Sequence, residues 1–467
     1  MSNTISQQEY DVIVLGGGSA GVAASIAAAR NGARTILVDA GPIIGGEMLS
    51  GIPIDGCLSS RGEWVVGGIT RELFAECDRM GGYIGPIDDH RALWVVAIDP
   101  EVMKLAVVKL VQRSGVALLL YTFAENVVVQ NGSVKGVMVL NKNRRTLLTG
   151  KVIIDCTGDA DAAVDAGAPW EIGNASTGDL QPVSMVYRMQ GVDTHRLLEF
   201  VRDHPEHFGL AEHKARGMTA KEAAEGLYKQ GLPKVFMVAN GPLMTKAIAD
   251  GEMYQSSMIA VTPISLQRRE VSINSTRIGN LDATQTAQLS GALPDLLDQV
   301  WMGVNFMRKY VPGFENAVFS GIAPRIGIRE TRRIVGEYVL TRDDIMQARK
   351  RPDGIGKGSH ELDIHGSGVK HERSTIKDGG SYDIPYDCLV PKNVKNMLVA
   401  GRCFSATREA HSSARVMGTC MAMGQAAGTA AAGFAADPKW NGDVRSIDIQ
   451  KLRASLIAQG AVLDGTF

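Results

Sequence analysis

The sequence predicts an α/β fold in which a doubly wound domain of parallel strands is divided by an inserted α+β domain. Near the N-terminus, a short apolar strand at residues 12–15 runs into a glycine turn and an alanine-rich helix. The same strand, turn and helix order returns between residues 384 and 436. The segment between about 165 and 320 is instead rich in charged helices and polar loops. We therefore expect a discontinuous domain to which both ends of the chain contribute.

The N-terminal glycine turn has the spacing of a dinucleotide-binding fingerprint. Gly16 permits a tight turn, Gly18 lets the backbone approach a pyrophosphate, and Gly21 lets the helix pack closely on the strand. The start of that helix offers N–H groups and a positive dipole end to phosphates. Asp39 ends the second strand, where a carboxylate can bind ribose hydroxyls. The chain is therefore expected to bind a dinucleotide in a Rossmann-like domain.

Composition narrows the classes of function. The 467 residues include 49 Lys and Arg against 50 Asp and Glu, so no overall field favours nucleic acid or an anionic membrane. Six cysteines show neither CxxC nor metal-ligand spacing, which predicts buried thiols and no metal site. No apolar run reaches the roughly 18–20 residues that span a bilayer, and residues 1–9 do not resemble a signal peptide. We expect a cytoplasmic protein.

Four segments are expected along the chain. The first contains a helix over 100–115, a strand over 116–121, a hairpin turning at Asn131-Gly132 and a buried strand over 151–156. The segments are residues 1–164 (first part of the nucleotide domain), 165–320 (an inserted substrate or cap domain), 321–383 (a connection contributing to the active site) and 384–467 (second part of the nucleotide domain).

Three stretches together favour FAD over NAD. Residues 16–21, 157–159 and 398–402 resemble the FAD-contacting segments of the glutathione-reductase-like flavoprotein superfamily. More narrowly, the chain resembles FAD-dependent oxidoreductases related to fumarate reductase flavoproteins. That resemblance rests on Gly45-Gly46 and on residues 67–72, 328–336 and 415–428. It implies FAD that extends from the first glycine turn to a helix that begins near Gly418. Covalent attachment to a His or Cys stays open, but no motif marks it, so we expect non-covalently held FAD.

The residues expected to hold the cofactor come from these segments. They are Gly16, Gly18, Ser19, Ala20, Gly21, Asp39, Ala40, Gly45, Gly46, Glu47, Thr157, Gly158, Asp159, Gly401, Arg402, Gly418 and Thr419. The helix starting at Gly418 would direct N–H groups and its dipole at the flavin edge that becomes negative on reduction.

A flavin of this kind transfers a hydride, so the protein must also manage one proton. His411, before the expected flavin helix, and His365, in a glycine-flanked loop, are the first candidates because imidazole titrates near neutral pH. His371 is expected to be solvated. Arg415 has the planar donor group that suits a carboxylate, and Tyr386 is a candidate hydrogen-bond donor. For each of these, a structural role is the alternative.

The expected function is hydride transfer between flavin N5 and a small polar metabolite at a CH–OH, CH–NH or CH–CH bond, with a carboxylate on the substrate left open. No second dinucleotide fingerprint follows, so the electron acceptor stays open among a quinone, oxygen, a partner protein or a second small molecule. An electron-transfer flavoprotein subunit of a larger complex and a tRNA-modifying flavoprotein remain alternatives. We expect a small-molecule substrate, no nucleic-acid or membrane partner, and leave a homo-oligomer open.

Overall fold

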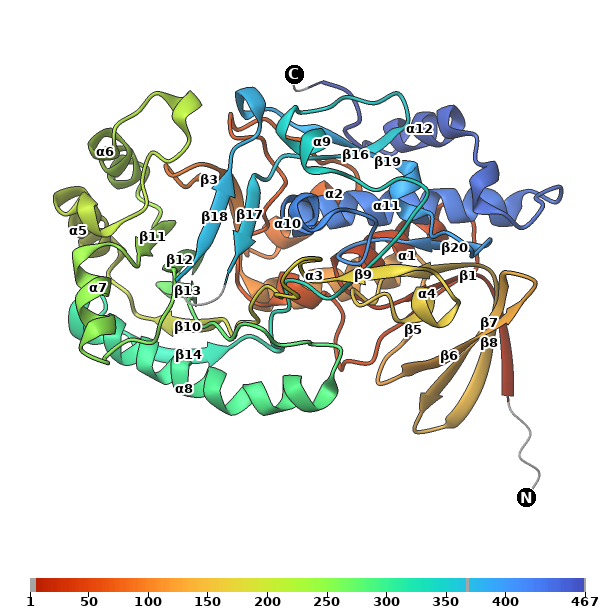
Figure 1. The fold of residues 1–467 in the computed structure, drawn as a ribbon, viewed down its shortest axis with the longest axis horizontal. Helices are drawn as coiled ribbons and strands as arrows, with labels where there is room; N and C mark the ends of the chain where they lie inside the picture. Colours follow the sequence, from red (N-terminus) through yellow and green to blue (C-terminus); the bar gives the residue numbers. More distant parts are fainter. Residues whose placement is uncertain (1–5, 367–368, 466–467) are drawn as a thin grey trace.

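Two sheets organise the chain, one parallel at its centre and one antiparallel (Figure 1). The computed structural model describes residues 6–366 and 369–465. In Figure 1 the parallel sheet and its helices lie on the right, and the green antiparallel region lies on the left. A hairpin of strands β17 and β18, drawn in blue, lies between the two regions.

The parallel sheet has seven strands in the order β5-β2-β1-β8-β7-β6, with β20 also paired to β8. Strands β5, β2, β1, β8 and β20 run parallel, whereas β7 and β6 are antiparallel. The bounds are β1 Ser6–Leu15, β2 Thr35–Val38, β5 Ala117–Leu119, β6 Phe123–Gln130, β7 Ser133–Asn141, β8 Arg144–Asp155 and β20 Met397–Val399. The sheet confirms the predicted α/β class with a Rossmann-like core, and its strands come from both ends of the chain.

Two long-separated helices pack against each other beside this sheet. A Cβ added at Gly424 would lie 2.1 Å from the carbonyl oxygen of Ala20, and one at Gly428 would lie 2.1 Å from that of Ala24. The backbones of α1 and α11 are therefore in direct contact. The helices of this region are α1 Ser19–Arg30, α2 Ile69–Arg79, α3 Pro100–Arg113, α4 Asp161–Asp165, α10 Arg408–Ala414, α11 Met417–Ala436 and α12 Ile449–Ala458.

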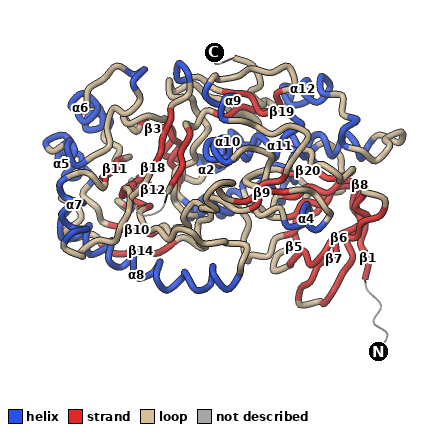
Figure 2. The backbone as a smooth tube through the Cα atoms, viewed as in Figure 1, coloured by secondary structure: helices blue, strands red, loops and turns tan. Residues whose placement is uncertain are grey.

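The inserted region has a sheet and a hydrophobic core of its own. Its five strands are antiparallel in the order β11-β12-β13-β10-β14. Figure 2 shows its helices along the outer side of that sheet. The elements are β10 Tyr187–Gln190, α5 Thr194–Asp203, α6 Ala220–Gln230, β11 Val235–Val238, α7 Pro242–Ala249, β12 Met258–Ser265, β13 Glu270–Asn274, α8 Thr286–Tyr310 and β14 Val318–Ile322.

Shorter elements connect the two regions. The two-stranded pairs are β3 Tyr83–Asp88 with β4 Trp94–Ile98, β9 Trp170–Ile172 with β15 Arg332–Ile334, β16 Gly354–Gly358 with β19 Tyr382–Pro385, and β17 Leu362–His365 with β18 His371–Ser374. Helix α9 covers Arg342–Met346. Within the described ranges, no helix is both long and apolar enough to cross a membrane.

Local sequence signals account for several element boundaries. The helix expected over 100–115 is α3, which begins at Pro100 after the capping side chain of Asp99. Asn131 and Gly132 have φ angles of 54° and 75°, the left-handed pair that a two-residue hairpin turn requires. The strand expected over 151–156 starts earlier, because β8 also pairs with β7 from Arg144 onward.

Candidate active site

The first glycine turn leaves open space beside the start of α1. A Cβ at Gly16 would lie 2.4 Å from the carbonyl oxygen of Cys156, and one at Gly21 would lie 1.8 Å from that of Gly16. A Cβ at Gly18, in contrast, would have no described atom within 4 Å. The first N–H groups of a helix have no partner inside it. This open space and those amides together suit a pyrophosphate.

Asp39 holds the turn from the other side. Its Oδ2 accepts a hydrogen bond from the Gly17 amide at 2.5 Å, and its Oδ1 accepts one from the Gly41 amide at 2.6 Å. Half-buried, it lines a pocket of about 510 Å³. The predicted cofactor residues in that lining are Gly16, Asp39, Ala40, Gly46, Thr157 and Asp159. The carboxylate expected to bind ribose therefore also fixes the loop.

The other two predicted cofactor segments meet beside this pocket. The Arg402 guanidinium donates to Oδ1 of Asp159 at 2.9 Å. A Cβ at Gly158 would lie 2.8 Å from that guanidinium, and one at Gly401 would lie 2.9 Å from the Cβ of Ala20. The three segments are far apart in the sequence and adjacent in the fold.

A second glycine loop leads from the pocket toward the inserted region. The Gly45 amide donates to the Gly17 carbonyl at 2.7 Å. A Cβ at Gly46 would lie 2.9 Å from Cα of Gly18, so only glycine allows this approach. Gly46 lines the pocket, and Glu47 lines a second hollow, which we call the central cavity. The two hollows are therefore neighbours, as an extended dinucleotide requires.

The start of α11 also reaches the central cavity, but not all of its amides are open. The Gly418 amide donates to the Asp55 carbonyl at 2.9 Å, so it is not available to a flavin, which corrects the expectation from the sequence. The Thr419 hydroxyl is buried and has no hydrogen-bond partner among the described residues. Arg415 and Val416, just before the helix, line the cavity.

Five arginines line the central cavity, which has a volume of about 190 Å³, and three of them influence one another electrostatically. Arg329 donates to the Pro182 carbonyl at 2.8 Å and to the Ser184 hydroxyl at 2.6 Å. Nε of Arg415 is buried without a partner among the described residues. Arg277, from the inserted region, is the third cavity-lining guanidinium of this group, which we call the arginine cluster.

The guanidinium groups of the arginine cluster are buried close enough together to repel one another. Burial, together with the guanidinium groups of Arg415 and Arg277, lowers the pKa of Arg329 to about 9. Burial also lowers the pKa values of Arg277 and Arg415. Like charges held together away from water favour an anionic ligand, and guanidinium groups bind carboxylates with directional hydrogen bonds.

Asp363 connects two histidines at the edge of the same cavity. Its Oδ2 lies 3.0 Å from Nε2 of His365, its Oδ1 is hydrogen-bonded to Nε2 of His371, and the two rings stack with centroids 4.6 Å apart. Burial alone would raise the pKa of Asp363, but the two imidazoles hold it well below its usual range. His371 was expected to be solvated; its side chain is 10% exposed and bound to Asp363.

The hydrogen bonds of His365 fix its tautomer. An arginine can only donate, so the Arg277 guanidinium, 3.0 Å from Nδ1, makes Nδ1 an acceptor. Nε2 then carries the proton that is donated to Asp363. Burial lowers the pKa of His365 to about 3, so its ring is neutral. His365 thus reaches the cavity as predicted, but it orients Arg277 and has no free nitrogen to accept a proton.

The structure places His411 and Tyr386 outside the cavity lining. His411 is fully buried, its Nε2 donates to the Arg402 carbonyl at 2.7 Å, and its ring stacks on Phe404. Burial holds the pKa of His411 well below its usual value. Tyr386 is 2% exposed and donates to the Val444 carbonyl at 3.0 Å in the C-terminal core. Both correct the catalytic roles expected from the sequence.

Comparison with known proteins decides the family. A family model described as FAD dependent oxidoreductase matches residues 11–456. The chain belongs to the FAD dependent oxidoreductase family. Its cofactor is FAD, and it is an FAD-dependent oxidoreductase. The open space at Gly18 and the adjoining hollows fit that cofactor.

Curated relatives of this oxidoreductase match only in part. The tRNA uridine 5-carboxymethylaminomethyl modification enzyme MnmG of Endomicrobium trichonymphae is 29% identical over 174 residues, 34% of this chain and 25% of that enzyme. The MnmG of Lactococcus lactis is 43% identical over 79 residues, 17% of this chain and 11% of that enzyme. The chain thus spans a quarter or less of the length of these relatives.

Solved structures resemble the oxidoreductase over most of its length. A geranylgeranyl bacteriochlorophyll reductase-like protein from Thermoplasma acidophilum has a TM-score of 0.45 at 13% identity, covering 97% of this chain and 84% of that one. The flavin-dependent brominase Bmp2 has a TM-score of 0.48 at 12% identity, covering 96% of this chain and 83% of that one.

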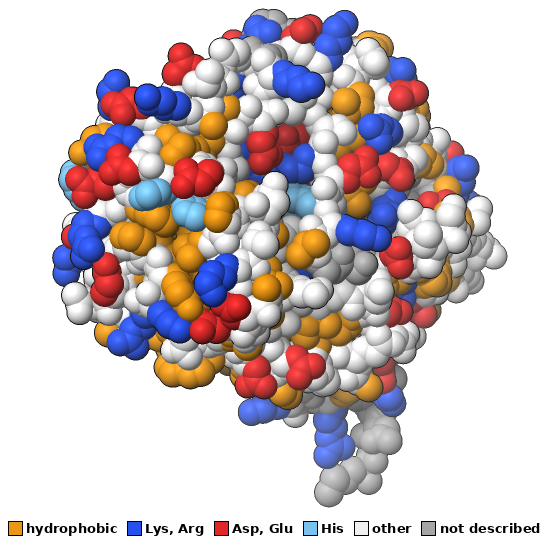
Figure 3. Space-filling model, turned by 60° about the vertical axis from the view of Figure 1, so that its left-hand side comes forward, with side chains coloured by type: hydrophobic (Ala, Val, Ile, Leu, Met, Phe, Trp, Pro, Cys, Tyr) orange, Lys and Arg blue, Asp and Glu red, His pale blue; other side chains and the backbone are white. Residues whose placement is uncertain are grey.

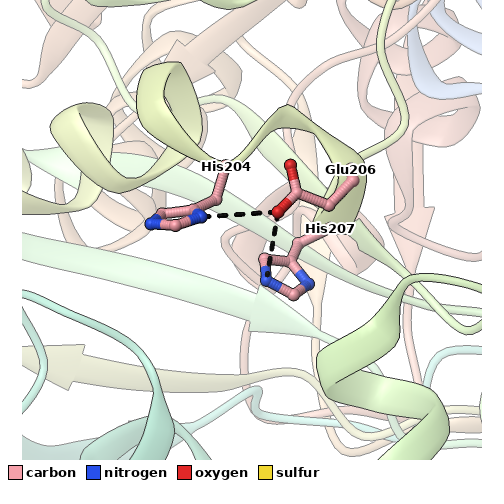
Figure 4. A group of neighbouring side chains, drawn as sticks. All are labelled: His204, Glu206 and His207. Carbon is pink, nitrogen blue, oxygen red and sulfur yellow. Dashed lines mark hydrogen bonds and ion pairs between the residues drawn. The ribbon is translucent and has the colours of Figure 1, made fainter.

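A cluster of potential metal ligands lies in the inserted region of the oxidoreductase, outside the lining of the central cavity. Figure 4 shows the rings of His204 and His207 beside the carboxylate of Glu206. Nδ1 of His204 lies 3.4 Å from that carboxylate, and Nε2 of His207 lies 3.9 Å from it. The Leu243 amide donates to Nδ1 of His207, so Nε2 carries the proton of the neutral ring and opposes metal binding.

Sequence reasoning missed several polar residues that line the central cavity, among them Asp55, Lys234 and His360. Lys234 is 2% exposed, and burial lowers its pKa to about 8. Burial raises the pKa of Asp55. No local motif marks these residues, since they lie in three distant segments and are brought together only by the tertiary fold.

Proposed function

We propose that this oxidoreductase transfers a hydride between a small carboxylate-bearing metabolite and N5 of its flavin, at the central cavity. FAD supplies the hydride-accepting or hydride-donating group when bound. The observation that carries the proposal is the arginine cluster of Arg277, Arg329 and Arg415, three guanidinium groups whose pKa values are lowered by burial. An anion among them would relieve their mutual repulsion.

Within this proposal, the residues of the chain bind and orient the substrate. Arg329 is anchored on the Pro182 carbonyl and the Ser184 hydroxyl, so its remaining donors have a fixed direction. Arg277 is held through His365 and Asp363. Binding one end of the substrate at fixed donors places its reacting bond, which is how orientation lowers a barrier.

The same proposal includes a relationship of this chain to the fumarate reductase flavoproteins. It is supported by the resemblance of residues 328–336 and 415–428, which contribute Arg329 and Arg415 to the cavity. We keep the electron acceptor as a quinone, oxygen, a partner protein or a second small molecule, because the sequence contains no second dinucleotide fingerprint.

The test uses oxalate as a carboxylate probe of the FAD-loaded protein. Oxalate is expected to perturb the visible flavin spectrum, and Arg329→Met is expected to weaken its binding about 10- to 100-fold, as for loss of a hydrogen bond to a charged group. Arg196→Met is the control, since Arg196 is an exposed residue paired with Glu315. Equal oxalate affinity in wild type and Arg329→Met would contradict the proposal.

A tRNA uridine is the second candidate substrate, because the partial relatives are named as tRNA uridine modification enzymes. A tRNA-binding protein needs a basic surface for the phosphate backbone. On the face shown in Figure 3, positive and negative side chains are interspersed. Salt-sensitive binding of tRNA to the FAD-loaded protein, competing with oxalate, would favour this candidate over a small metabolite.

A further inference from the structure

The central cavity contains a third histidine, His360, whose ring is arranged differently from those of His365 and His371. His360 is 6% exposed and lines the cavity. Its Nδ1 lies 2.8 Å from the Glu361 carbonyl oxygen. A carbonyl can only accept, so Nδ1 carries the proton and Nε2 is unprotonated. Among the described residues, none donates a hydrogen bond to that nitrogen.

The segment around His360 is held in place from several sides. It follows strand β16, and the Ser359 hydroxyl donates to the Leu58 carbonyl at 2.7 Å. The Ser413 hydroxyl donates to the carbonyl of His360 itself. The next residue, Glu361, is ion-paired with Arg373. A general base must present its unprotonated nitrogen in a fixed orientation, and the fixed tautomer and backbone of His360 meet this requirement.

We propose that His360 is the general base of the reaction and that the substrate is a 2-hydroxy acid. This rests on the proposed function above. The carboxylate binds the arginine cluster. The hydroxyl O–H bond breaks with its proton going to Nε2 of His360, while the adjacent C–H bond breaks with its electron pair leaving as hydride to the cofactor. The product is a 2-oxo acid, and the reverse direction returns the same proton.

The charges around His360 keep its ring neutral and available. Burial lowers its pKa, and Arg373 and Arg415 lower it further, while Asp55 and Asp363 act in the opposite direction. Lys234 and Glu361 are the other charged groups of this neighbourhood. A neutral imidazole can accept a hydroxyl proton near pH 7, which a protonated one cannot.

The charge of the cavity favours a hydroxy acid over an amino acid. Six cationic and four acidic side chains line it: Arg91, Lys234, Arg277, Arg329, Arg373 and Arg415 against Glu47, Asp55, Asp89 and Asp363. Arg91 and Arg373 are also ion-paired with Glu212 and Glu361 outside this lining, so the positive charge that favours a ligand is that of the arginine cluster. It attracts a carboxylate and repels an ammonium group. A hydroxyl group carries no such penalty.

The experiment is anaerobic reduction of the FAD-loaded protein by glycolate, D-lactate, L-lactate and malate. We expect at least one of them to bleach the visible flavin band. His360→Asn and His360→Gln should retain FAD and oxalate binding, yet slow bleaching about 10²- to 10⁴-fold, the range for loss of a general base. His213→Asn is the control, because His213 is equally buried but lies outside the central cavity.

Three results would overturn the inference. Wild-type bleaching rates in both His360 variants would remove His360 from the reaction, and oxalate binding would still support the proposed function. Failure of every 2-hydroxy acid to bleach the flavin would remove the substrate class. If neither variant folds, NMR spectra of wild-type protein labelled with ¹⁵N-histidine replace the variants. Oxalate is expected to shift the signal of one unprotonated Nε2, and the absence of such a shift would overturn the proposal.

Discussion

Gly18 differs from Gly16 and Gly21 in the reason why glycine occupies the position. Gly16 and Gly21 are needed by neighbouring backbone atoms, whereas a side chain at Gly18 would meet none of the described atoms within 4 Å. Its φ of −74° is also open to other residues. The protein itself therefore does not need glycine at this position, and we predict that the bound cofactor does.

Gly18→Ala is accordingly expected to weaken FAD binding without weakening the fold. The added methyl group has room in the protein but projects toward the predicted pyrophosphate. We expect an unchanged urea midpoint for the apoprotein and a loss of FAD affinity, measured by flavin fluorescence. Gly291→Ala, at another unhindered glycine on α8, is the control. Full FAD affinity in Gly18→Ala would place the pyrophosphate elsewhere.

The buried charge of Lys234 lowers the free energy of unfolding of the protein. Its pKa is lowered to about 8 by burial, below the value of about 10.4 in an unfolded chain. Below pH 8 the lysine is protonated in both states, so the cost of burying its charge is fully present. As the pH rises from 8 toward the unfolded value, the folded state loses its proton first and stability increases.

Lys234→Met should therefore stabilise the protein at pH 7, by about 1–3 kcal/mol. The gain should shrink above pH 8, where wild type no longer carries the charge. Urea unfolding at pH 7 and pH 10 measures both effects. Lys229→Met is the control on an exposed helical lysine. A destabilised Lys234→Met variant at pH 7 would mean that Asp55 or Asp89 compensates the buried charge.

Functional residues can be predicted from the sequence where their role depends on local conformation, but not where only tertiary structure brings them together. The glycine turn, Asp39 and the residues around Gly401 can be predicted because a turn, a strand end and a helix start have fixed spacings. His360, Lys234 and Asp55 have no such signature. His411 was predicted from its place before α11, but the turn of α10 directs its ring to the Arg402 carbonyl, away from the cavity lining.

At the scale of elements, the contact between α1 and α11 joins the two halves of the FAD-binding region. Gly424 and Gly428 let the two backbones touch, because glycine has no side chain to hold them apart. Periodicity could predict a buried helix at α11, but not its partner. The helix can be predicted from the sequence, but its contact with α1 depends on tertiary packing and is seen only in the structure.

Gly424→Ala is expected to destabilise the protein by about 1–3 kcal/mol, because the new methyl group would overlap the Ala20 carbonyl oxygen. Gly433→Ala, in the same helix with open space around it, should instead stabilise by about 0.5–1 kcal/mol. Urea unfolding of the two variants separates helix propensity from packing. Similar stability for both would show that α1 and α11 separate without cost.

For the molecule as a whole, the cavity exists because two regions meet. Arg329 and Arg415 come from segments around the FAD-binding region, whereas Arg277 and Lys234 come from the inserted one. The sequence predicts that the inserted domain determines substrate choice, but it cannot show which of its side chains line the central cavity. The segment boundaries and a homo-oligomer stay predictions.

The most direct test of the central claim is a crystal structure of the FAD-loaded protein soaked with oxalate. We predict the adenosine beside Asp39, the pyrophosphate at Gly18, the flavin ring between Glu47 and Val416, and oxalate on Arg329. Oxalate bound away from the arginine cluster, or a flavin ring outside the central cavity, would contradict the account.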